Sequence, residues 1–218
     1  MILDALRLSL QVSLLATLLV TVVGTLLGWG LARLRFPGRE LLDALITLPL
    51  VLPPTVTGYY LLRLLGRRGL LGGPIYEATG FTVAFTWWAA VLAAALVSLP
   101  LMVRSARAAI EAVDPDLEFA AATLGSGRWH AFRRVTLPLA QRGILAGVVL
   151  AFGRAMGEFG ATLMIAGNIP GRTQTMPLAI WEAVVSGEDT RALTLVLLLT
   201  GLSVAVLLLV GRIGRPRL

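Results

Sequence analysis

Arg154 and Glu158 are the two charged residues inside a long apolar stretch that covers residues 143–166. Residues four positions apart lie on one face of an α-helix, where a guanidinium and a carboxylate can pair. If this stretch crosses a membrane, both charges are costly unless they face a protein interior or an aqueous path. The spacing therefore favours two interpretations: side chains that line a transport path, or a structural ion pair that locks a helical bundle.

Pro49, Pro53 and Pro54 interrupt a second apolar stretch, at 41–65. Proline has no backbone N–H and its ring clashes with the carbonyl four residues earlier, so several carbonyls lose their helical partners. Within a membrane, such carbonyls are tolerated only where protein or water can satisfy them. The pattern predicts a kinked helix that either faces the interior of an assembly or is simply a distorted packing helix.

Several other chemistries are excluded by residues that the chain lacks. All 19 basic residues are arginine, and the usual P-loop needs a lysine to reach the phosphates of a nucleotide. The sequence has no cysteine, which excludes disulfides and thiolate metal sites. The one histidine, His130, is interpreted as a surface contact rather than a ligand. We therefore expect no catalytic, cofactor or metal site, and any ATP hydrolysis must come from a partner.

The composition indicates a membrane protein. The chain has 218 residues, of which 57% are hydrophobic, and its mean hydropathy is +0.84, too apolar for a soluble domain of this size. A helix needs about 20 apolar residues to cross a hydrocarbon core of about 30 Å. The predicted fold is therefore an all-α integral membrane domain over residues 1–218, with five transmembrane spans at about 8–33, 41–65, 78–103, 143–166 and 192–211.

The arginines cluster at the ends of these stretches, which favours an orientation in the membrane over nucleic-acid binding as the meaning of the net charge of +7. With the N-terminus outside and the C-terminus inside, six arginines lie outside, Arg154 lies within the membrane, and twelve lie inside. This excess follows the positive-inside rule. The twelve are Arg33, Arg35, Arg39, Arg104, Arg107, Arg128, Arg133, Arg134, Arg142, Arg212, Arg215 and Arg217.

The longest polar interruption of the chain runs from Glu118 to Pro138. Just before it, Asp114 and Pro115 are typical of an N-cap and a first helical position, and Gly125 supplies a stop, so a short helix is expected over 115–124. Its Leu and Ala residues recur at i, i+3, i+4 and i+7, giving a narrow apolar face that can fit a groove. That face consists of Leu117, Ala120, Ala121 and Leu124.

A second short helix is expected directly after this one. Ser126 can cap the segment RWHAFRR, which begins at Arg128. The following Val-Thr-Leu-Pro ends at Pro138, where proline is expected to force a new chain direction.

The order of alanines, glycine and aliphatic-x-Leu-Pro resembles the cytoplasmic coupling loop of ABC importer permeases, which docks into a cleft on a separate ATPase subunit. One departure is that Phe119 lies directly before the two alanines, where the family has glutamate, while Glu118 lies one residue earlier. The alternative is an ordinary amphipathic connector between two membrane helices. The resemblance implies that the residues coupled to the ATPase are Glu118, Ala120, Ala121, Gly125 and Pro138.

The segment from Glu158 to Thr175, with Glu-Phe-Gly-Ala, Asn-Ile-Pro-Gly and Thr-x-Thr, resembles the oxyanion branch of these permeases, the molybdate and sulfate importers. The short length, the segment LPLVLPPTVTGYYLL and the single small external loop look most like the molybdate permease. The resemblance implies the type I importer fold, alternating access and a prokaryotic cytoplasmic membrane. Implied partners are a second copy, two cytoplasmic ATPase subunits that hold ATP and magnesium, and an extracytoplasmic oxyanion-binding protein.

The same resemblance assigns roles to two further groups of residues. The translocation path would be lined by Pro53, Pro54, Arg154 and Glu158, with transient passage rather than tight binding because Arg154 is the only intramembrane cation. The binding protein would contact Asn168, Pro170, Gly171 and Arg172.

Three other functions compete with this interpretation. Sulfate or thiosulfate is the alternative cargo, and molybdate cannot be separated from tungstate because both are tetrahedral dianions of similar size. An ion-coupled secondary transporter usually shows an internal repeat with paired broken helices, which five spans do not provide. A purely structural membrane subunit is favoured only if the predicted coupling loop binds no ATPase.

Overall fold

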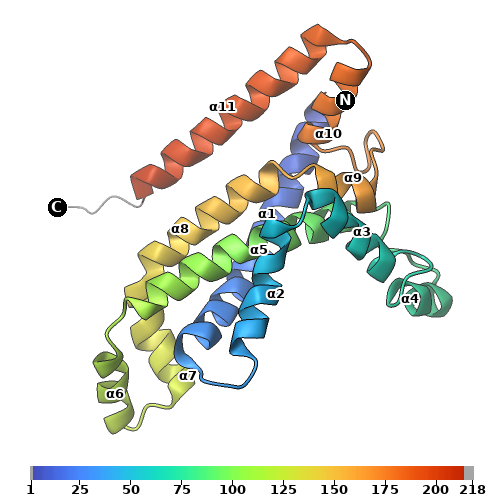
Figure 1. The fold of residues 1–218 in the computed structure, drawn as a ribbon. Helices are drawn as coiled ribbons and strands as arrows, with labels where there is room; N and C mark the ends of the chain where they lie inside the picture. The colour runs from blue at the N-terminus through green and yellow to red at the C-terminus, as the bar shows by residue number, and fades with distance from the viewer. Residues whose placement is uncertain (1, 214–218) are drawn as a thin grey trace.

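The computed structural model describes residues 2–213, and within that range every regular element is a helix (Figure 1). This confirms the predicted all-α fold. In chain order the helices are α1 (Ile2–Arg33), α2 (Arg39–Val51), α3 (Pro54–Leu65), α4 (Gly72–Thr79), α5 (Trp87–Glu111), α6 (Pro115–Thr123), α7 (Arg128–Ala131), the π-helical turn η1 (Phe132–Thr136), α8 (Leu137–Met156), α9 (Gly160–Ala166), α10 (Met176–Val185) and α11 (Asp189–Ile213).

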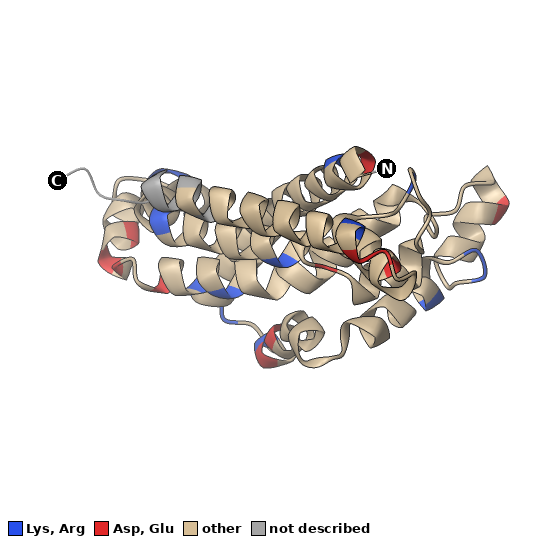
Figure 2. Ribbon diagram, turned by 90° about the horizontal axis from the view of Figure 1, so that it is seen from above, with Lys and Arg blue, Asp and Glu red and all other residues tan. Residues whose placement is uncertain are grey.

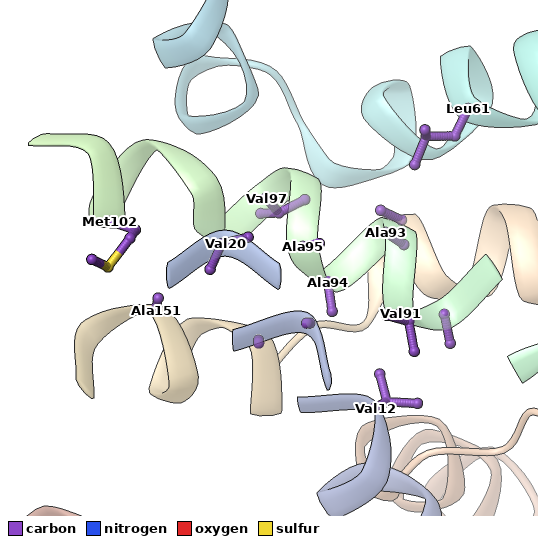
Figure 3. Close-up of a cluster of buried hydrophobic side chains, with 14 of the residues drawn as sticks. Val12, Val20, Leu61, Val91, Ala93, Ala94, Ala95, Val97, Met102 and Ala151 are labelled. Atoms are coloured by element: carbon purple, nitrogen blue, oxygen red, sulfur yellow. The ribbon is translucent and has the colours of Figure 1, made fainter. Parts of the chain in front are cut away.

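Helices α1, α5 and α8 form the centre of the molecule (Figure 1). Their side chains meet in one buried apolar cluster, in which Figure 3 shows Val20 of α1, Met102 of α5 and Ala151 of α8. Small residues let these helices approach closely. A Cβ added to Gly28 of α1, for example, would lie only 2.9 Å from the Cβ of Ala106 on α5.

The predicted second span is broken rather than kinked. Helices α2 and α3 meet at an angle of 116°, and only as a pair do they qualify as a membrane span. The residue before a proline is disfavoured in the helical region. Leu52 precedes Pro53, and Pro53 precedes Pro54; both Leu52 and Pro53 are extended, with ψ of 142° and 137°. Two successive prolines therefore end one helix and start the next, whereas the isolated Pro49 stays inside α2.

The predicted third span, 78–103, corresponds to α5. The helix starts later because α4 occupies the first of these residues and ends at Thr79, followed by the C-cap Gly80, whose φ is +69°. Thr86 then caps α5: its Oγ1 accepts a hydrogen bond from the N–H of Ala89 at 3.4 Å. At the other end α5 continues to Glu111, so Arg104 and Arg107, which follow the predicted end of this span, lie on its last turns.

Pro138 does not redirect the chain, contrary to expectation. The helices from Arg128 to Met156 form one continuous span, and Pro138 lies in the first turn of α8. The π-helical turn η1 precedes it, and there the N–H of Leu137 donates to the carbonyl of Phe132. Because this wider turn displaces the carbonyls from their α-helical positions, it can accommodate a proline ring that an ordinary turn would exclude.

Within the described residues, four helices are long and apolar enough to cross a membrane, and the bent α2–α3 pair makes up to five. The short helix that follows the turn at 170–172 is α10, and the predicted last span is α11, which packs mainly on α10 and lies to one side of the central helices (Figure 1). Arg215 and Arg217 lie outside the described residues, as does the side chain of Arg212.

The two ends of the helical bundle are defined by polar contacts. At one end, which we call the α6 end, Arg107 Nη1 lies 3.0 Å from Asp43 Oδ2, joining α5 to α2. At the opposite α10 end, the N–H of Met176 donates to Ser9 Oγ at 2.7 Å, joining α10 to α1. Figure 2 shows most charged residues toward the ends of the long helices and few along their middle.

Candidate coupling loop and translocation path

The helix expected over 115–124 is α6. Asp114 caps it by accepting a hydrogen bond from the N–H of Asp116 at 2.9 Å, and Pro115 occupies the first turn. The helix ends at Thr123 with Leu124 as its C-cap, and the next residue, Gly125, has φ of +83°. A Cβ on Gly125 would have no neighbour within 4 Å, so glycine is needed here for its backbone conformation rather than for space.

The predicted apolar face of α6 is accessible. Ala120 is exposed, Ala121 is half-buried and Leu124 is 87% exposed, while Phe119, in the position of the family's glutamate, is 67% exposed. Large exposed apolar side chains gathered in one place are typical of surfaces that bind another protein. Leu117, also exposed, extends the same surface. One face of α6, made of Leu117, Ala120, Ala121 and Leu124, is therefore apolar and largely exposed, and we call it the docking surface. Successive residues of a helix are turned by about 100°, so Phe119 lies on another side of α6.

Glu118 does not belong to that surface. Its Oε1 accepts a hydrogen bond from Arg33 Nε at 2.9 Å and another from Thr136 Oγ1 at 2.7 Å. Arg33 Nη2 also donates to the carbonyl of Val113 at 2.7 Å. The carboxylate therefore joins α6 to the last residue of α1 and to the π-helical turn.

The second short helix, α7, is capped differently from the prediction. Gly127 rather than Ser126 is its N-cap, and no side chain caps it. Of the five residues predicted to couple to the ATPase, Glu118, Ala120, Ala121 and Gly125 lie together on α6 or at its end. The fifth, Pro138, is exposed and lies apart from them in α8.

Arg154 and Glu158 pair as predicted, with Nη1 and Oε2 2.9 Å apart. They do not share a helix face, because α8 ends at Met156 and Glu158 lies in the break before α9. The other carboxylate oxygen of Glu158 accepts a hydrogen bond from the N–H of Ala161 at 2.7 Å. Glu158 thus accepts a backbone hydrogen bond from the first turn of α9 and also neutralises the charge of Arg154. The side chain of Glu158 is 2% exposed, and that of Arg154 is 28% exposed.

The two predicted path elements lie against each other. Pro53 and Pro54 are exposed at the corner between α2 and α3. A Cβ added to Gly160 at the start of α9 would lie 2.9 Å from Pro54 Cβ, and one added to Gly58 would lie 2.8 Å from Ala161 Cα. The proline corner and the break that holds Glu158 are therefore parts of one junction.

The predicted binding-protein contacts divide into a half-buried anchor, Asn168, and an exposed turn. Asn168 donates to Glu182 Oε2 at 2.9 Å and accepts from Gln174 Nε2 at 3.1 Å; Gln174 also donates to Glu182. This network attaches the segment to α10. Pro170, Gly171 and Arg172 form an exposed turn at the α10 end, away from α6.

A family model described as "Binding-protein-dependent transport system inner membrane component" matches residues 21–216. The chain belongs to this family. It is accordingly a multi-pass membrane component, a permease, as its apolar helices indicate.

Relatives of this permease include permease proteins of molybdenum and sulfate transport systems. The "Molybdenum transport system permease protein ModB" of Escherichia coli (strain K12) is 49% identical over 217 residues, which covers 98% of this chain and 95% of that protein. The "Sulfate transport system permease protein CysW" of Synechococcus elongatus is 40% identical over 216 residues, covering 97% of this chain and 75% of that protein.

The fold of the permease also matches a solved structure. A chain of the inward-facing MetNI methionine ABC transporter aligns with a TM-score of 0.77 at 17% identity, over 98% of this chain and 94% of that one. This likeness concerns the fold alone, and it confirms the predicted type I ABC importer permease architecture.

Four site residues of the permease escaped prediction from the sequence: Arg33, Thr136, Gln174 and Glu182. In the sequence, Arg33 indicates only the membrane orientation, and Thr136 belongs only to the Val-Thr-Leu-Pro pattern. Their partner Glu118 lies 85 and 18 residues away in the chain. No local signal connects residues at such separations. Gln174 lies within the Thr-x-Thr motif, which is the one signal that pointed near it.

Proposed function

We propose that this permease is the membrane-spanning subunit of an ATP-driven importer that moves molybdate, or tungstate, by alternating access. The observation that carries the proposal is the 49% identity to a molybdenum transport permease over nearly the whole length of both chains. The aligned region covers nearly all of this chain, so it includes the predicted spans and the polar segments between them rather than one shared motif.

The proposed assembly has two copies of the permease, two cytoplasmic ATPase subunits that hold ATP and magnesium, and an extracytoplasmic oxyanion-binding protein. The docking surface on α6 offers exposed apolar side chains to an ATPase, among them Leu117 and Leu124. The turn Pro170–Arg172 lies at the opposite end of the bundle and suits contact with the binding protein. This arrangement puts the N-terminus outside and the C-terminus inside.

The junction of the proline corner with the α8–α9 break is the proposed part of the translocation path. It brings exposed Pro53 and Pro54 close to the region of the Arg154–Glu158 pair. Arg154 is already paired, so it provides little free positive charge for an anion. We expect transient passage of the anion here, and selectivity in the binding protein.

The test is the ATPase activity of the reconstituted complex in lipid, with binding protein loaded in turn with molybdate, tungstate or sulfate. Stimulation by molybdate or tungstate, but not by sulfate, is the expected result. If no oxyanion stimulates the complex, or if the permease does not co-purify with an ATPase, the proposal is overturned.

Sulfate or thiosulfate is a second candidate cargo, favoured by the 40% identity to a sulfate permease over 97% of this chain. The same experiment separates the two, because sulfate-loaded binding protein would then stimulate the ATPase most.

A further inference from the structure

We propose that Arg33, Glu118 and Thr136 form a clamp that holds the coupling helix α6 to α1, so that the two helices move as one body when the ATPase pulls on the loop. In this role Glu118 is a positioning residue rather than an ATPase contact. The inference rests on the proposed function, because it assumes that α6 docks to an ATPase.

The clamp is a set of three hydrogen bonds between segments that are distant in the chain. Glu118 Oε1 accepts from both Arg33 Nε and Thr136 Oγ1, at 2.9 and 2.7 Å. The second arm of Arg33 donates to the carbonyl of Val113, just before α6, at 2.7 Å. Arg33 therefore binds both a side chain of α6 and the backbone of the segment that precedes α6. Hydrogen bonds between charged groups are shorter and stronger than neutral ones.

Burial strengthens this arrangement. The side chain of Thr136 is fully buried, and those of Arg33 and Glu118 are both mostly shielded from solvent. Exposed ion pairs contribute little to stability because water and salt screen them. A shielded, hydrogen-bonded pair instead fixes how the two helices that carry it are oriented. The clamp is thus suited to hold α6 at a set angle.

An aromatic layer lies beside the clamp and joins the same elements. The ring of Trp29 on α1 lies 4.9 Å from that of Phe132 in η1 and 6.1 Å from that of Trp129 in α7, between centroids. Trp129 and Phe132 lie 5.3 Å apart. Aromatic pairs at these distances attract each other beyond the burial of their area. Both halves of the coupling loop are therefore attached to the last turns of α1.

At its other end, α1 is bonded to α10. Ser9 Oγ accepts the N–H of Met176 at 2.7 Å, and Ala5 is buried in a cluster with Met176 and Ala179. Helix α1 consequently runs from the loop proposed to meet the ATPase to the helix that follows the proposed binding-protein turn. The clamp is the junction at the α6 end of that connection.

Conservative substitutions provide the first test, made in the full complex of permease, ATPase and binding protein. Arg33→Gln and Glu118→Gln each break the charged pair, and Thr136→Val removes only one hydroxyl. Matched controls are Arg35→Gln and Asp116→Asn. Both control residues are exposed, and neither side chain has a hydrogen bond or ion-pair partner among the described residues.

The expected result has two parts. The three clamp variants co-purify with the ATPase in wild-type stoichiometry and keep basal ATPase activity, but stimulation by loaded binding protein falls about fivefold or more, the scale of a typical coupling free energy. The double variant Arg33→Gln, Glu118→Gln loses no more than either single variant, since both remove one interaction. If Glu118→Gln alone weakens co-purification while Arg33→Gln does not, Glu118 contacts the ATPase and the proposal is overturned.

A cross-link provides the second test, which holds even if a clamp variant is poorly stable. The permease has no cysteine, so Arg33→Cys with Glu118→Cys introduces the only two thiols of this chain. The unlinked variant should lose stimulation. A short bifunctional methanethiosulfonate reagent should restore it by tying α6 to α1, and reductant should abolish it again. A linked complex without stimulation would show that α6 must move relative to α1, and would overturn the clamp.

The two proposals fail in different ways. If the wild-type complex is not stimulated by any loaded binding protein, the proposed function fails before the clamp is tested. If the wild type is stimulated and the clamp variants are stimulated equally, only the clamp is wrong.

Discussion

Pro54 lies directly against Gly160. A Cβ added to Gly160 would be 2.9 Å from Pro54 Cβ and 3.4 Å from the backbone nitrogen of Thr55. This contact brings the corner between α2 and α3 onto the break between α8 and α9, two interruptions that lie more than a hundred residues apart in the sequence. Irregular backbone in a membrane needs protein or water around it, and here each interruption is packed against the other.

Gly160→Ala should therefore destabilise this junction. The new methyl group has no room beside Pro54, and overpacking of this kind costs about 1–3 kcal/mol. The expected result is a lower thermal midpoint of the purified complex and weaker transport. Gly153→Ala is the matched control, because a Cβ there has no neighbour within 4 Å. Equal midpoints for the two variants would contradict the packing argument.

The Arg154–Glu158 pair predicts an asymmetric effect of mutation. Arg154→Gln leaves a carboxylate that is 2% exposed without its counter-charge, and breaking a buried pair in this way costs about 3–5 kcal/mol. Glu158→Gln should cost less, because Arg154 is 28% exposed and can reach water, and because the amide oxygen of glutamine can still accept the N–H of Ala161. The loss of stability in each variant is measured as the shift of its thermal unfolding midpoint. The double variant should be more stable than Arg154→Gln, and the idea is wrong if it is less stable.

Gly125→Val should uncouple the ATPase. At φ of +83° a residue with a Cβ costs roughly 1–2 kcal/mol, and a β-branched side chain costs more, so the end of α6 would be rebuilt. Gly127→Val is the control: its φ is −66°, and neither glycine has a neighbour within 4 Å of an added Cβ. We expect binding-protein-stimulated ATPase activity to be lost only in the first variant. Retention in both would show that the conformation of Gly125 is not needed for coupling.

The proposed orientation can be measured because the chain has no cysteine. Ala122→Cys on α6 and Arg172→Cys at the α10 end both place a single thiol at an exposed position. In spheroplasts, a membrane-impermeant maleimide should label the thiol at position 172 and should reach position 122 only after permeabilisation. The opposite pattern would invert the topology and separate the docking surface from any cytoplasmic ATPase.

The sequence alone determined the features that depend on composition and local chemistry. Hydropathy indicates a helical membrane protein because each span must satisfy its own backbone in lipid. Asp114, Pro115 and Gly125 determine the start and end of α6, because capping and left-handed φ are properties of a few neighbouring residues. The family resemblance was also readable from these local motifs.

Tertiary structure decided the features that depend on how distant segments meet. The prolines predicted a kink, but the structure has a full break with a bend of 116°, and Pro54 at this break packs against Gly160. The pairing of Arg154 with Glu158 was predicted, yet Glu158 reaches its partner from a break rather than from the same helix. The clamp was not visible in the sequence at all, because Arg33 meets Glu118 only after α1 and α5 have packed and carried the coupling loop to the end of α1.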